Sequence, residues 1–290
     1  MNSCAILLDY RGAEKTGKCL ESLLGQGLST IYVVDNCDHP EWSARLKNTV
    51  AGFKTSNPGI DVRLISASAN LGFAGGVNLA ITTDISSPQP HDFFLLINND
   101  AVAGPGLLAG LLKSLQEDRS VMLAAPCIRQ QGAGEECGLW YNRYTGILSR
   151  HKLPLSFLYI SGCCMLVDRR LAGDNGLFDP DFFMYGEDAL FCWQLWKKGQ
   201  PYKLVPGVYA EHAVGASSNK AGMFYEYHTT RGHVLMATKA CHSAIEIPAM
   251  LLTKFVTLFI RSLFRCLTYR SLVPARAFFL AWLPLNIRIP

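Results

Sequence analysis

Short apolar runs alternate with segments of helical periodicity through the first half of the chain. The runs end in polar residues, which is typical of strands buried on both faces. Between them, apolar side chains recur every three or four residues, as in amphipathic helices. The predicted strands are 4–9, 31–34, 62–66, 93–97 and 121–125, and the predicted helices are 15–24, 41–53, 77–83 and 107–115. This alternation predicts an α/β fold, a mostly parallel sheet with helices on both faces.

The second half keeps these signals but adds loops. Residues 132–154 are mixed and contain glycines, which predicts loops or a hairpin. An apolar strand is predicted over 158–167, interrupted by Ser161 and Gly162. The remaining predicted elements are an aromatic-rich loop over 177–186, a helix over 187–198 and a strand over 203–212.

The C-terminal region is mostly apolar, and its polar positions recur every three or four residues, which places them in one stripe on a helix. The stripe consists of Lys254, Thr257, Arg261, Arg265 and Thr268. A wide apolar face beside a narrow basic stripe predicts a helix in a bilayer interface, with membrane contact through residues 249–268. A spanning helix is disfavoured because each cation would cost roughly 3 kcal/mol at mid-bilayer. The alternative is a helix docked on the body of the protein or on a second subunit.

Charge is unevenly distributed along the chain. The net charge is +4, but residues 240–290 hold six Lys and Arg against one acid, Glu246, so the excess lies entirely in the tail. This distribution argues against a nucleic-acid groove on the main body and favours anionic lipid as the partner of the tail. A hydrophobic fraction of 49% with 17% charged residues excludes a disordered polar chain.

The ten cysteines do not form the pattern of a disulfide framework, because the chain is long and no CxxC pair is present. Cys4, Cys163 and Cys192 lie in apolar runs, where thiols act as small buried hydrophobes. The first residues carry neither a basic segment nor an apolar signal core, so we expect no signal peptide and a reducing, cytoplasmic compartment.

Two segments are candidates for binding an anionic ligand. Asp35 follows an apolar strand, and a carboxylate at that place can accept hydrogen bonds from a nucleotide. Residues 70–78 (NLGFAGGVN) open a helix, where glycines let backbone amides approach an anion. The segment is neither GxGxxG nor a P-loop, so neither a dinucleotide nor an NTPase site is indicated. An N-cap for Asp35 and a tight strand–helix turn for residues 70–78 are the structural alternatives.

Three further positions carry groups suited to catalysis. Asn98-Asn99-Asp100 ends a predicted strand and offers oxygen ligands for a divalent cation that bridges a diphosphate. Glu187 and Asp188 open a helix, where one carboxylate can take a proton from an acceptor hydroxyl. His212 ends a strand and can ligate a metal or contact a phosphate. Taken singly, each has a structural alternative as a polar turn, a helix N-terminus or a structural histidine.

The order of the motifs is more informative than any one of them. The motifs are the strand ending in Asp35, NLGFAGGVN, LLINND, SGCCMLV, FDPDFFMYGEDALFCWQL and HAVGASS. This order resembles family 2 glycosyltransferases of the GT-A fold, in the branch with rhamnosyltransferases of bacterial polysaccharide assembly. The resemblance covers roughly residues 3–218. It implies a GT-A catalytic domain over 1–218 and a helical, basic amphipathic region over 219–290.

The resemblance also assigns roles to residues. The base of the family lies in the ED pair, here Asp188 with Glu187 as runner-up. The family's DxD motif holds the metal; Asn98 replaces its first acid, so the metal rests mainly on Asp100, with His212 as the second candidate ligand. The residues implied to bind the sugar nucleotide are Asp35, Asn70, Gly72, Phe73, Gly75, Asn78, Asn98, Asn99 and Asp100.

The activity implied by the resemblance is inverting sugar transfer that needs Mg²⁺ or Mn²⁺. The favoured donor is dTDP-rhamnose and the acceptor is a lipid-linked saccharide at the cytoplasmic membrane face, in cell-surface polysaccharide synthesis. Leu190 and Gln194 stand where branch members often carry an acid and an arginine, so donor and acceptor details are open. A UDP-hexose-dependent transferase and a non-catalytic sugar-nucleotide-binding subunit are the alternatives. No basic, glycine-rich N-terminal signature supports a nucleotidyltransferase.

Overall fold

A computed structural model describes residues 2–130, 134–212 and 221–283. The chain forms two compact units. The first comprises residues 1–138, 160–180 and 199–214, and the second comprises residues 139–159, 181–198 and 215–290. The predicted domain boundary at residue 218 stays a prediction, because it falls on residues outside the described part.

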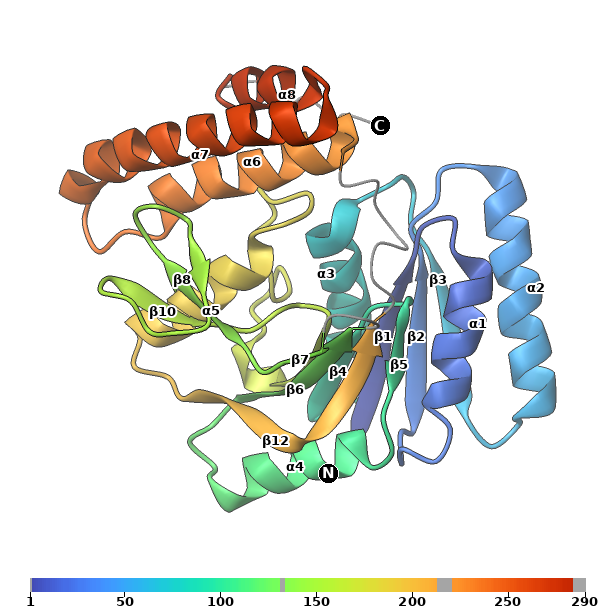
Figure 1. Ribbon diagram of the computed structural model, residues 1–290. Coiled ribbons are helices and arrows are strands. Elements are labelled where there is room, and N and C mark those ends of the chain that lie inside the picture. Colours follow the sequence, from blue (N-terminus) through green and yellow to red (C-terminus); the bar gives the residue numbers. More distant parts are fainter. Residues whose placement is uncertain (1, 131–133, 213–220, 284–290) are drawn as a thin grey trace. The chain divides into compact units, whose positions relative to one another are not determined.

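The first unit is built on a mixed sheet with the strand order β3-β2-β1-β4-β11-β6-β12-β5, and β7 pairs with β6 (Figure 1). Strands β1, β2, β3, β4, β6 and β12 share one direction, while β5, β7 and β11 run against it. The predicted α/β fold with a mostly parallel sheet is therefore confirmed. The strands are β1 (Ser3–Asp9), β2 (Thr30–Asp35), β3 (Asp61–Ser66), β4 (Phe93–Ile97), β5 (Ala101–Ala103), β6 (Leu123–Gln130), β7 (Gly134–Glu136), β11 (Cys164–Asp168) and β12 (Tyr202–His212).

Helices cover both faces of this sheet. Its core joins inward side chains of β1, β2 and β4 to the apolar faces of α1 (Ala13–Ser22), α2 (Pro40–Ser56) and α4 (Leu107–Glu117). Helix α3 (Gly72–Ile85) lies on the opposite face, where Gly76 approaches Leu8 of β1. Strands buried on both faces explain why the sequence shows continuous apolar runs rather than alternation. A short 3₁₀ helix, η1 (Arg169–Leu171), follows β11.

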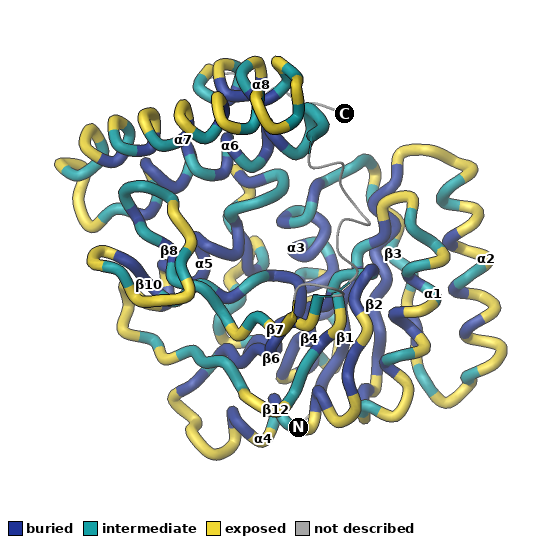
Figure 2. Tube along the Cα trace, in the orientation of Figure 1, coloured by how far each residue is buried: buried dark blue, intermediate teal, exposed yellow. Residues whose placement is uncertain are grey.

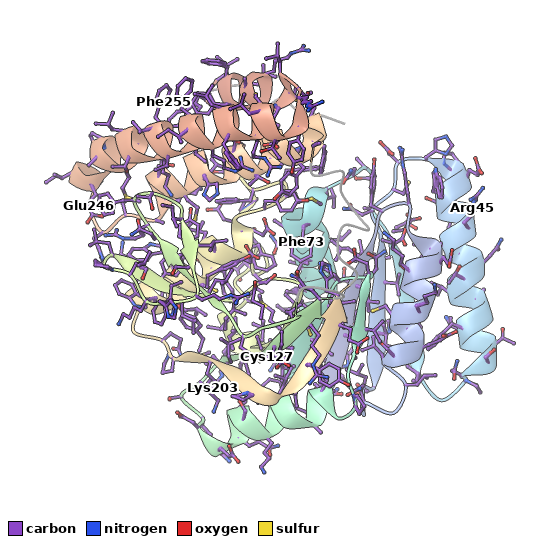
Figure 3. All side chains as sticks on the ribbon, viewed as in Figure 1. Arg45, Phe73, Cys127, Lys203, Glu246 and Phe255 are labelled. Atoms are coloured by element: carbon purple, nitrogen blue, oxygen red, sulfur yellow. A yellow bond between two sulfur atoms is a disulfide. The ribbon has the colours of Figure 1, made fainter. Side chains whose placement is uncertain are left out.

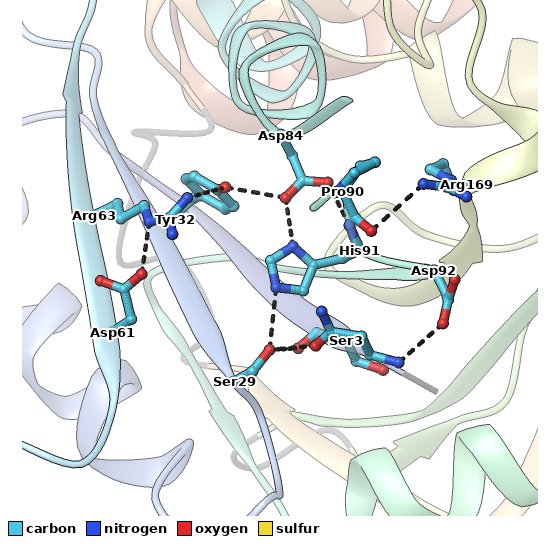
Figure 4. Close-up of polar contacts among 11 residues, drawn as sticks. Ser3, Ser29, Tyr32, Asp61, Arg63, Asp84, Pro90, His91, Asp92 and Arg169 are labelled. Atoms are coloured by element: carbon cyan, nitrogen blue, oxygen red, sulfur yellow. Dashed lines mark hydrogen bonds and ion pairs between the residues drawn. The ribbon is translucent and has the colours of Figure 1, made fainter. Parts of the chain in front are cut away.

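A buried polar network ties α3 to the amino-terminal edge of this sheet (Figure 4). The Asp84 carboxylate is fully buried and accepts hydrogen bonds from the Tyr32 hydroxyl (3.0 Å) and the His91 backbone N–H (2.9 Å). It also pairs with His91 Nδ1, while His91 Nε2 lies 3.1 Å from the Ser29 hydroxyl. Each polar atom of Asp84 thus has a partner, as a buried carboxylate requires.

The second unit combines a small antiparallel sheet with a layer of helices. The sheet has the order β10-β8-β9, and helix α5 follows the aromatic-rich loop. Helix α6 is largely buried, whereas α7 and α8 alternate between buried and exposed residues (Figure 2). The elements are β8 (Leu139–Asn142), β9 (Leu148–Ser149), β10 (Ser156–Tyr159), α5 (Glu187–Lys197), α6 (Met223–Lys239), the 3₁₀ turn η2 (Ala244–Glu246), α7 (Ile247–Tyr269) and α8 (Val273–Ala281).

Three sequence predictions need correction. Helix α3 begins at Gly72, so residues 72–76 are helical rather than loop. The run 158–167 is two strands of different sheets, because β10 ends at Tyr159 and β11 begins at Cys164. Strand β6 spans Leu123–Gln130, later than predicted.

The cysteine prediction holds with one exception. Six of the free cysteines are buried, among them Cys4, Cys163 and Cys192. Cys127 and Cys137, however, form a disulfide with a Cα–Cα distance of 4.4 Å. The antiparallel pairing of β6 with β7 sets Ile128 opposite Glu136, so the flanking cysteines face one another. This cross-strand pairing is invisible to a count of cysteines and their spacing.

The tail forms the predicted helix, but the polar stripe of this helix points toward the rest of the second unit. Lys254 is fully buried and donates to the Tyr141 hydroxyl at 3.0 Å. Arg265 and Arg261 pair with the buried Glu226 of α6 at 2.5 Å and 3.4 Å. The expectation that these cations meet anionic lipid is therefore wrong, since they are used within the second unit.

Candidate active site

The carboxyl edge of the first unit's sheet gathers acidic side chains. In the parallel register, Asp9 of β1 lies opposite Asp35 of β2, which in turn lies opposite Ser66 of β3. Asp9 and Asp35 are both buried. Ligands of such sheets bind at this edge, where the strands end and loops begin. The register thus places the predicted nucleotide contact Asp35 at the binding edge.

Asp35 is held by the turn that follows it. Its Oδ1 accepts a hydrogen bond from the Cys37 backbone N–H at 3.2 Å. The next residue, Asn36, fixes the start of α3, because its Oδ1 accepts from the Leu71 N–H (2.9 Å) and its Nδ2 donates to the Gly72 carbonyl (2.9 Å). Asn70 Oδ1 accepts from the Gly72 N–H at 3.0 Å. The 70–72 turn is therefore built by side-chain amides before any ligand arrives.

Glycines let α3 lie close to the sheet. Gly72 has a φ of +71°, a conformation that strains other residues. A Cβ on Gly76 would lie 2.4 Å from Leu8 Cδ2 of β1, and a Cβ on Gly75 would lie 2.9 Å from Leu71 Cβ. These contacts give the glycines of NLGFAGGVN a packing role. Their predicted role toward the sugar nucleotide stays a prediction.

Phe73 and Asn78 connect α3 to the segment that follows β11. The Phe73 ring packs on the Phe178 ring with centroids 5.8 Å apart. The Asn78 amide donates to the Phe178 carbonyl (2.7 Å) and accepts from the backbone N–H groups of Leu177 (2.8 Å) and Phe178 (2.9 Å). Asn78 thus fixes the position of this segment, and its predicted contact with the donor stays a prediction.

A second buried acid, Asp9, organises the loop after β4. Its carboxylate accepts from the Thr16 hydroxyl (2.6 Å), the Gly12 N–H (3.2 Å) and Asn99 Nδ2 (3.2 Å). Burial raises the pKa of Asp9, and these hydrogen bonds oppose the rise. Asn99 also donates to the Thr16 hydroxyl at 3.0 Å, so its amide is directed toward α1.

Asp100 and His212 meet at the same edge although 112 residues separate them. Strand β12 pairs with β5 so that His212 lies opposite Ala101, which brings the imidazole beside the Asp100 carboxylate. His212 Nε2 is 3.1 Å from Asp100 Oδ1. The two predicted metal ligands are thus brought together by strand pairing. The rest of the HAVGASS motif lies outside the described residues.

This pair fits a divalent cation. Carboxylate oxygen and imidazole nitrogen are both accepted by Mn²⁺, whereas Mg²⁺ prefers oxygen alone. Two adjacent ligand atoms of an octahedral ion with bonds of about 2.1 Å lie about 3 Å apart. The two atoms form a hydrogen bond or ion pair here, and their separation of 3.1 Å is also close to that spacing.

In the second unit, glycines bring the loop before α5 against α6. Gly186 has a φ of +104°, and a Cβ there would lie 2.9 Å from Phe182. A Cβ on Gly232 of α6 would lie 2.1 Å from the Tyr185 carbonyl oxygen. The glycine of FFMYGED is therefore required by backbone packing, and this packing fixes where α5 begins.

The first turn of α5 carries the two candidate bases. Asp188 Oδ2 accepts a hydrogen bond from the Tyr159 hydroxyl at 2.8 Å, and Oδ1 lies 2.8 Å from the Ala189 N–H. Glu187 is buried, and its pKa is raised well above the usual range by burial and by the charge of Asp188. Burial likewise raises the pKa of Tyr159, which keeps the hydroxyl protonated and able to donate. Burial thus favours the protonated form of Glu187, and the contacts with Tyr159 and Ala189 orient the carboxylate of Asp188.

Three residues of these two sites were not among the predicted ones. Asp9 and Asn36 have a visible signal, since each lies at the end of an apolar strand, as Asp35 does. Tyr159 has no such signal, because its contact with Asp188 depends on packing between α5 and β10. Phe182 and Trp193 are buried in the core of the second unit.

Comparison with known proteins identifies the family of the chain. A family model described as "Glycosyltransferase like family 2" matches residues 9–226, most of the chain. Two curated proteins from strains of Mycobacterium tuberculosis, each named N-acetylglucosaminyl-diphospho-decaprenol L-rhamnosyltransferase, are 28% identical over 188 residues. That match covers 55% of this chain and only 61% of the relatives' own length.

Solved structures share the fold at low sequence identity. A mannosyltransferase from Pyrobaculum calidifontis in complex with GDP-Man and Mn²⁺ superposes with a TM-score of 0.60 at 16% identity, covering 99% of this chain and 76% of that one. GalNAc-T7 with UDP, GalNAc and Mn²⁺ superposes with a TM-score of 0.57 at 11% identity, covering 94% of this chain and 59% of that one. These likenesses confirm the GT-A fold, and both neighbours hold Mn²⁺ beside a nucleotide or a nucleotide sugar.

Proposed function

Because the chain belongs to glycosyltransferase family 2, we propose that it is an inverting, metal-dependent transferase acting from a nucleotide-diphosphate sugar. The observation that carries the proposal is the pairing of Asp100 with His212 at the carboxyl edge of the sheet, 3.1 Å apart. A carboxylate and an imidazole at this edge suit a cation that accompanies a diphosphate. The non-catalytic alternative, a sugar-nucleotide-binding subunit, would share this cation site but has no use for the acid pair of α5.

The first unit would bind the donor. Asp35 would accept hydrogen bonds from the nucleoside, and the amino-terminal end of α3, with Asn70, Gly72, Phe73 and Gly75, would face the phosphates. Asp100 and His212 would hold Mn²⁺ or Mg²⁺, which when bound neutralises charge on the departing diphosphate. The ordered 70–72 turn means that this surface needs little rearrangement before it binds.

The second unit would supply the base. Asp188 takes the proton of an acceptor hydroxyl as that oxygen attacks the anomeric carbon. The bond from the anomeric carbon to the phosphate oxygen breaks on the opposite face, and the nucleoside diphosphate leaves with the electron pair. Tyr159, which donates to Asp188 Oδ2, orients the carboxylate for this transfer.

The names of the relatives support a proposal for the sugar and the acceptor. The two mycobacterial proteins are named as rhamnosyltransferases acting on a decaprenol-linked diphosphate sugar. We therefore propose rhamnose from dTDP-rhamnose as the transferred sugar, a lipid-linked saccharide as acceptor, and action at the cytoplasmic face of the membrane. A UDP-hexose donor is the alternative, since one structural neighbour is described with UDP.

A panel of nucleotide sugars tests the donor and the metal together. We expect dTDP-rhamnose with Mn²⁺ to raise the melting temperature more than UDP- or GDP-sugars do, and EDTA to abolish the rise. Asp100→Asn should weaken the metal-dependent rise, because the amide carries no charge for the cation. Equal stabilisation of Asp100→Asn and wild type by metal and donor would contradict the assignment of the metal site.

The base is tested separately. Asp188→Asn should lower transfer by about 10³-fold, the middle of the range of general-base contributions. Thermal stabilisation by the donor should remain, because no donor-binding role is assigned to Asp188. Lys198→Met, an exposed position at the end of the same helix, is the matched control and should transfer sugar as wild type does. Wild-type turnover by Asp188→Asn would refute the role of Asp188.

A further inference from the structure

The outer side of α7 and α8 is an apolar surface exposed to solvent. Eight exposed residues of α7 follow at steps of three and one, which places them on one side of the helix. Phe255, one of them, lies on the outer side of α7 (Figure 3). The surface, called here the α7–α8 face, consists of Leu252, Phe255, Val256, Phe259, Ile260, Leu263, Phe264, Leu267, Leu272, Phe279 and Leu283.

The opposite side of α7 is engaged within the second unit. Met250, Lys254, Leu258 and Ser262 recur every four residues and are buried. Leu258 packs with Val234 of α6 and Phe278 of α8. The buried side of α7 thus mixes polar and apolar residues, while the solvent side is apolar, unlike a helix on the surface of a water-soluble domain. An exposed apolar patch of this extent marks an interaction site.

Composition and charge indicate a lipid surface as the occupant. Residues 247–283 contain no Asp or Glu, so nothing on this surface repels a phosphate headgroup. Arg270 and Arg276 are exposed where α7 turns into α8 and are complementary to that headgroup. By length and composition, the segment Ala244–Tyr269 qualifies among the described residues as a helix that can enter a membrane.

The internal contacts of α7 decide how it meets the bilayer. Arg261 and Arg265 pair with Glu226, which is 1% exposed, and Lys254 donates to Tyr141. A helix crossing the bilayer would have to leave these partners and carry three cations into hydrocarbon. Lying in the plane of the membrane keeps every one of these contacts. The same orientation immerses the apolar side chains.

We propose that α7 and α8 form an in-plane membrane-docking surface, in which the α7–α8 face enters the acyl-chain region of one leaflet. The apolar side chains supply the binding, and Arg270 and Arg276 add an attraction to anionic headgroups. The sequence by itself also favoured a helix lying in the bilayer interface, with its basic stripe at anionic lipid. The structure differs in using that stripe for contacts within the second unit, which leaves the apolar side for the membrane. This proposal does not rest on the sugar-transfer proposal, because docking needs neither donor nor acceptor.

Vesicle flotation of the full chain distinguishes docking through the apolar α7–α8 face from docking through the basic stripe. We expect flotation with neutral phosphatidylcholine vesicles, persisting in high salt, and an increase of roughly tenfold in partitioning when anionic lipid is added. Phe264→Ser combined with Leu267→Ser should lower partitioning to neutral vesicles about 100-fold, at about tenfold for each large apolar side chain. Ile147→Ser combined with Leu155→Ser, also exposed in the second unit, is the matched control and should bind as wild type does.

Depth of insertion is tested by fluorescence. Phe264→Trp should be quenched by lipids brominated on the acyl chain, most strongly when the bromine lies near the headgroup end. An unchanged urea unfolding midpoint in every variant reports that the fold is intact. Flotation only with anionic vesicles and lost in salt would overturn the proposal. The proposal would also be overturned if a second copy of the chain covered the α7–α8 face in solution. That outcome would appear as a dimer that Phe264→Ser combined with Leu267→Ser converts to monomer, while flotation stays as in wild type.

Discussion

Replacing the buried Lys254 with methionine should stabilise the protein, and more so at low pH. Lys254 is fully buried on α7, and burial, together with the positive charge of Arg143, lowers its pKa to about 7. Its ammonium donates to Tyr141, whose hydroxyl in turn pairs with His233 Nδ1 at 2.8 Å. Burial and the charge of Lys254 lower the pKa of His233 to about 3, so the imidazole is neutral and accepts this hydrogen bond.

The magnitude follows from the pKa of Lys254 in the folded and unfolded chain. A fall in this pKa from 10.5 to about 7 lowers the free energy of unfolding by about 5 kcal/mol when the side chain is charged in both states. The cost is complete below pH 7 and is relieved as pH rises from 7 to 10.5, where only the unfolded chain still binds the proton. Loss of the hydrogen bond to Tyr141 offsets about 1 to 2 kcal/mol of the gain. Lys254→Met should therefore gain about 3 kcal/mol at pH 6, and nearly 3 kcal/mol less at pH 9.

Urea unfolding of wild type and Lys254→Met at pH 6 and pH 9 measures this difference. Methionine keeps the length of the aliphatic stem, so packing around the site is preserved. Lys198→Met removes an exposed lysine from the same unit and should show no pH-dependent difference. A Lys254→Met effect that is equal at both pH values would refute the reasoning, since it would mean that Lys254 has the same affinity for its proton in both states.

Three further substitutions test individual contacts. Tyr159→Phe should lower turnover about tenfold, because it removes the hydroxyl that orients Asp188. It should also shift the pH profile of kcat, and an unchanged profile would contradict the positioning role of Tyr159. Asn78→Ala should cost about 3 kcal/mol in urea unfolding, because the backbone of Leu177 and Phe178 loses its partners; a cost below 1 kcal/mol would mean that water replaces the amide. Gly76→Ala should destabilise the fold by about 2 kcal/mol, because the new methyl group clashes with Leu8. Gly52→Ala on α2, where nothing lies near the Cβ, should instead stabilise the fold. Equal effects of the two substitutions would show that α3 shifts to admit a methyl group.

Much of the first unit could be predicted from sequence because its strands are buried on both faces. Strands such as Phe93–Ile97 stand out as apolar runs whatever lies beside them. The same pattern located Asp35 and Asp100, since a strand that ends at a polar residue marks the edge where ligands bind. Tyr159 was missed because the hydrogen bond it donates to Asp188 joins residues 29 positions apart through packing that no local pattern encodes.

The sequence by itself determined the alternation of strands and helices, the candidate acids and the helical spacing of the polar stripe, because each depends on local periodicity. Only the tertiary structure decided the pairing of Asp100 with His212 and of Cys127 with Cys137, since strand register sets both. It also decided which side of α7 faces outward. Periodicity gives two faces of a helix but not their environment, and the buried Glu226 of α6 draws the cations inward and leaves the apolar side exposed.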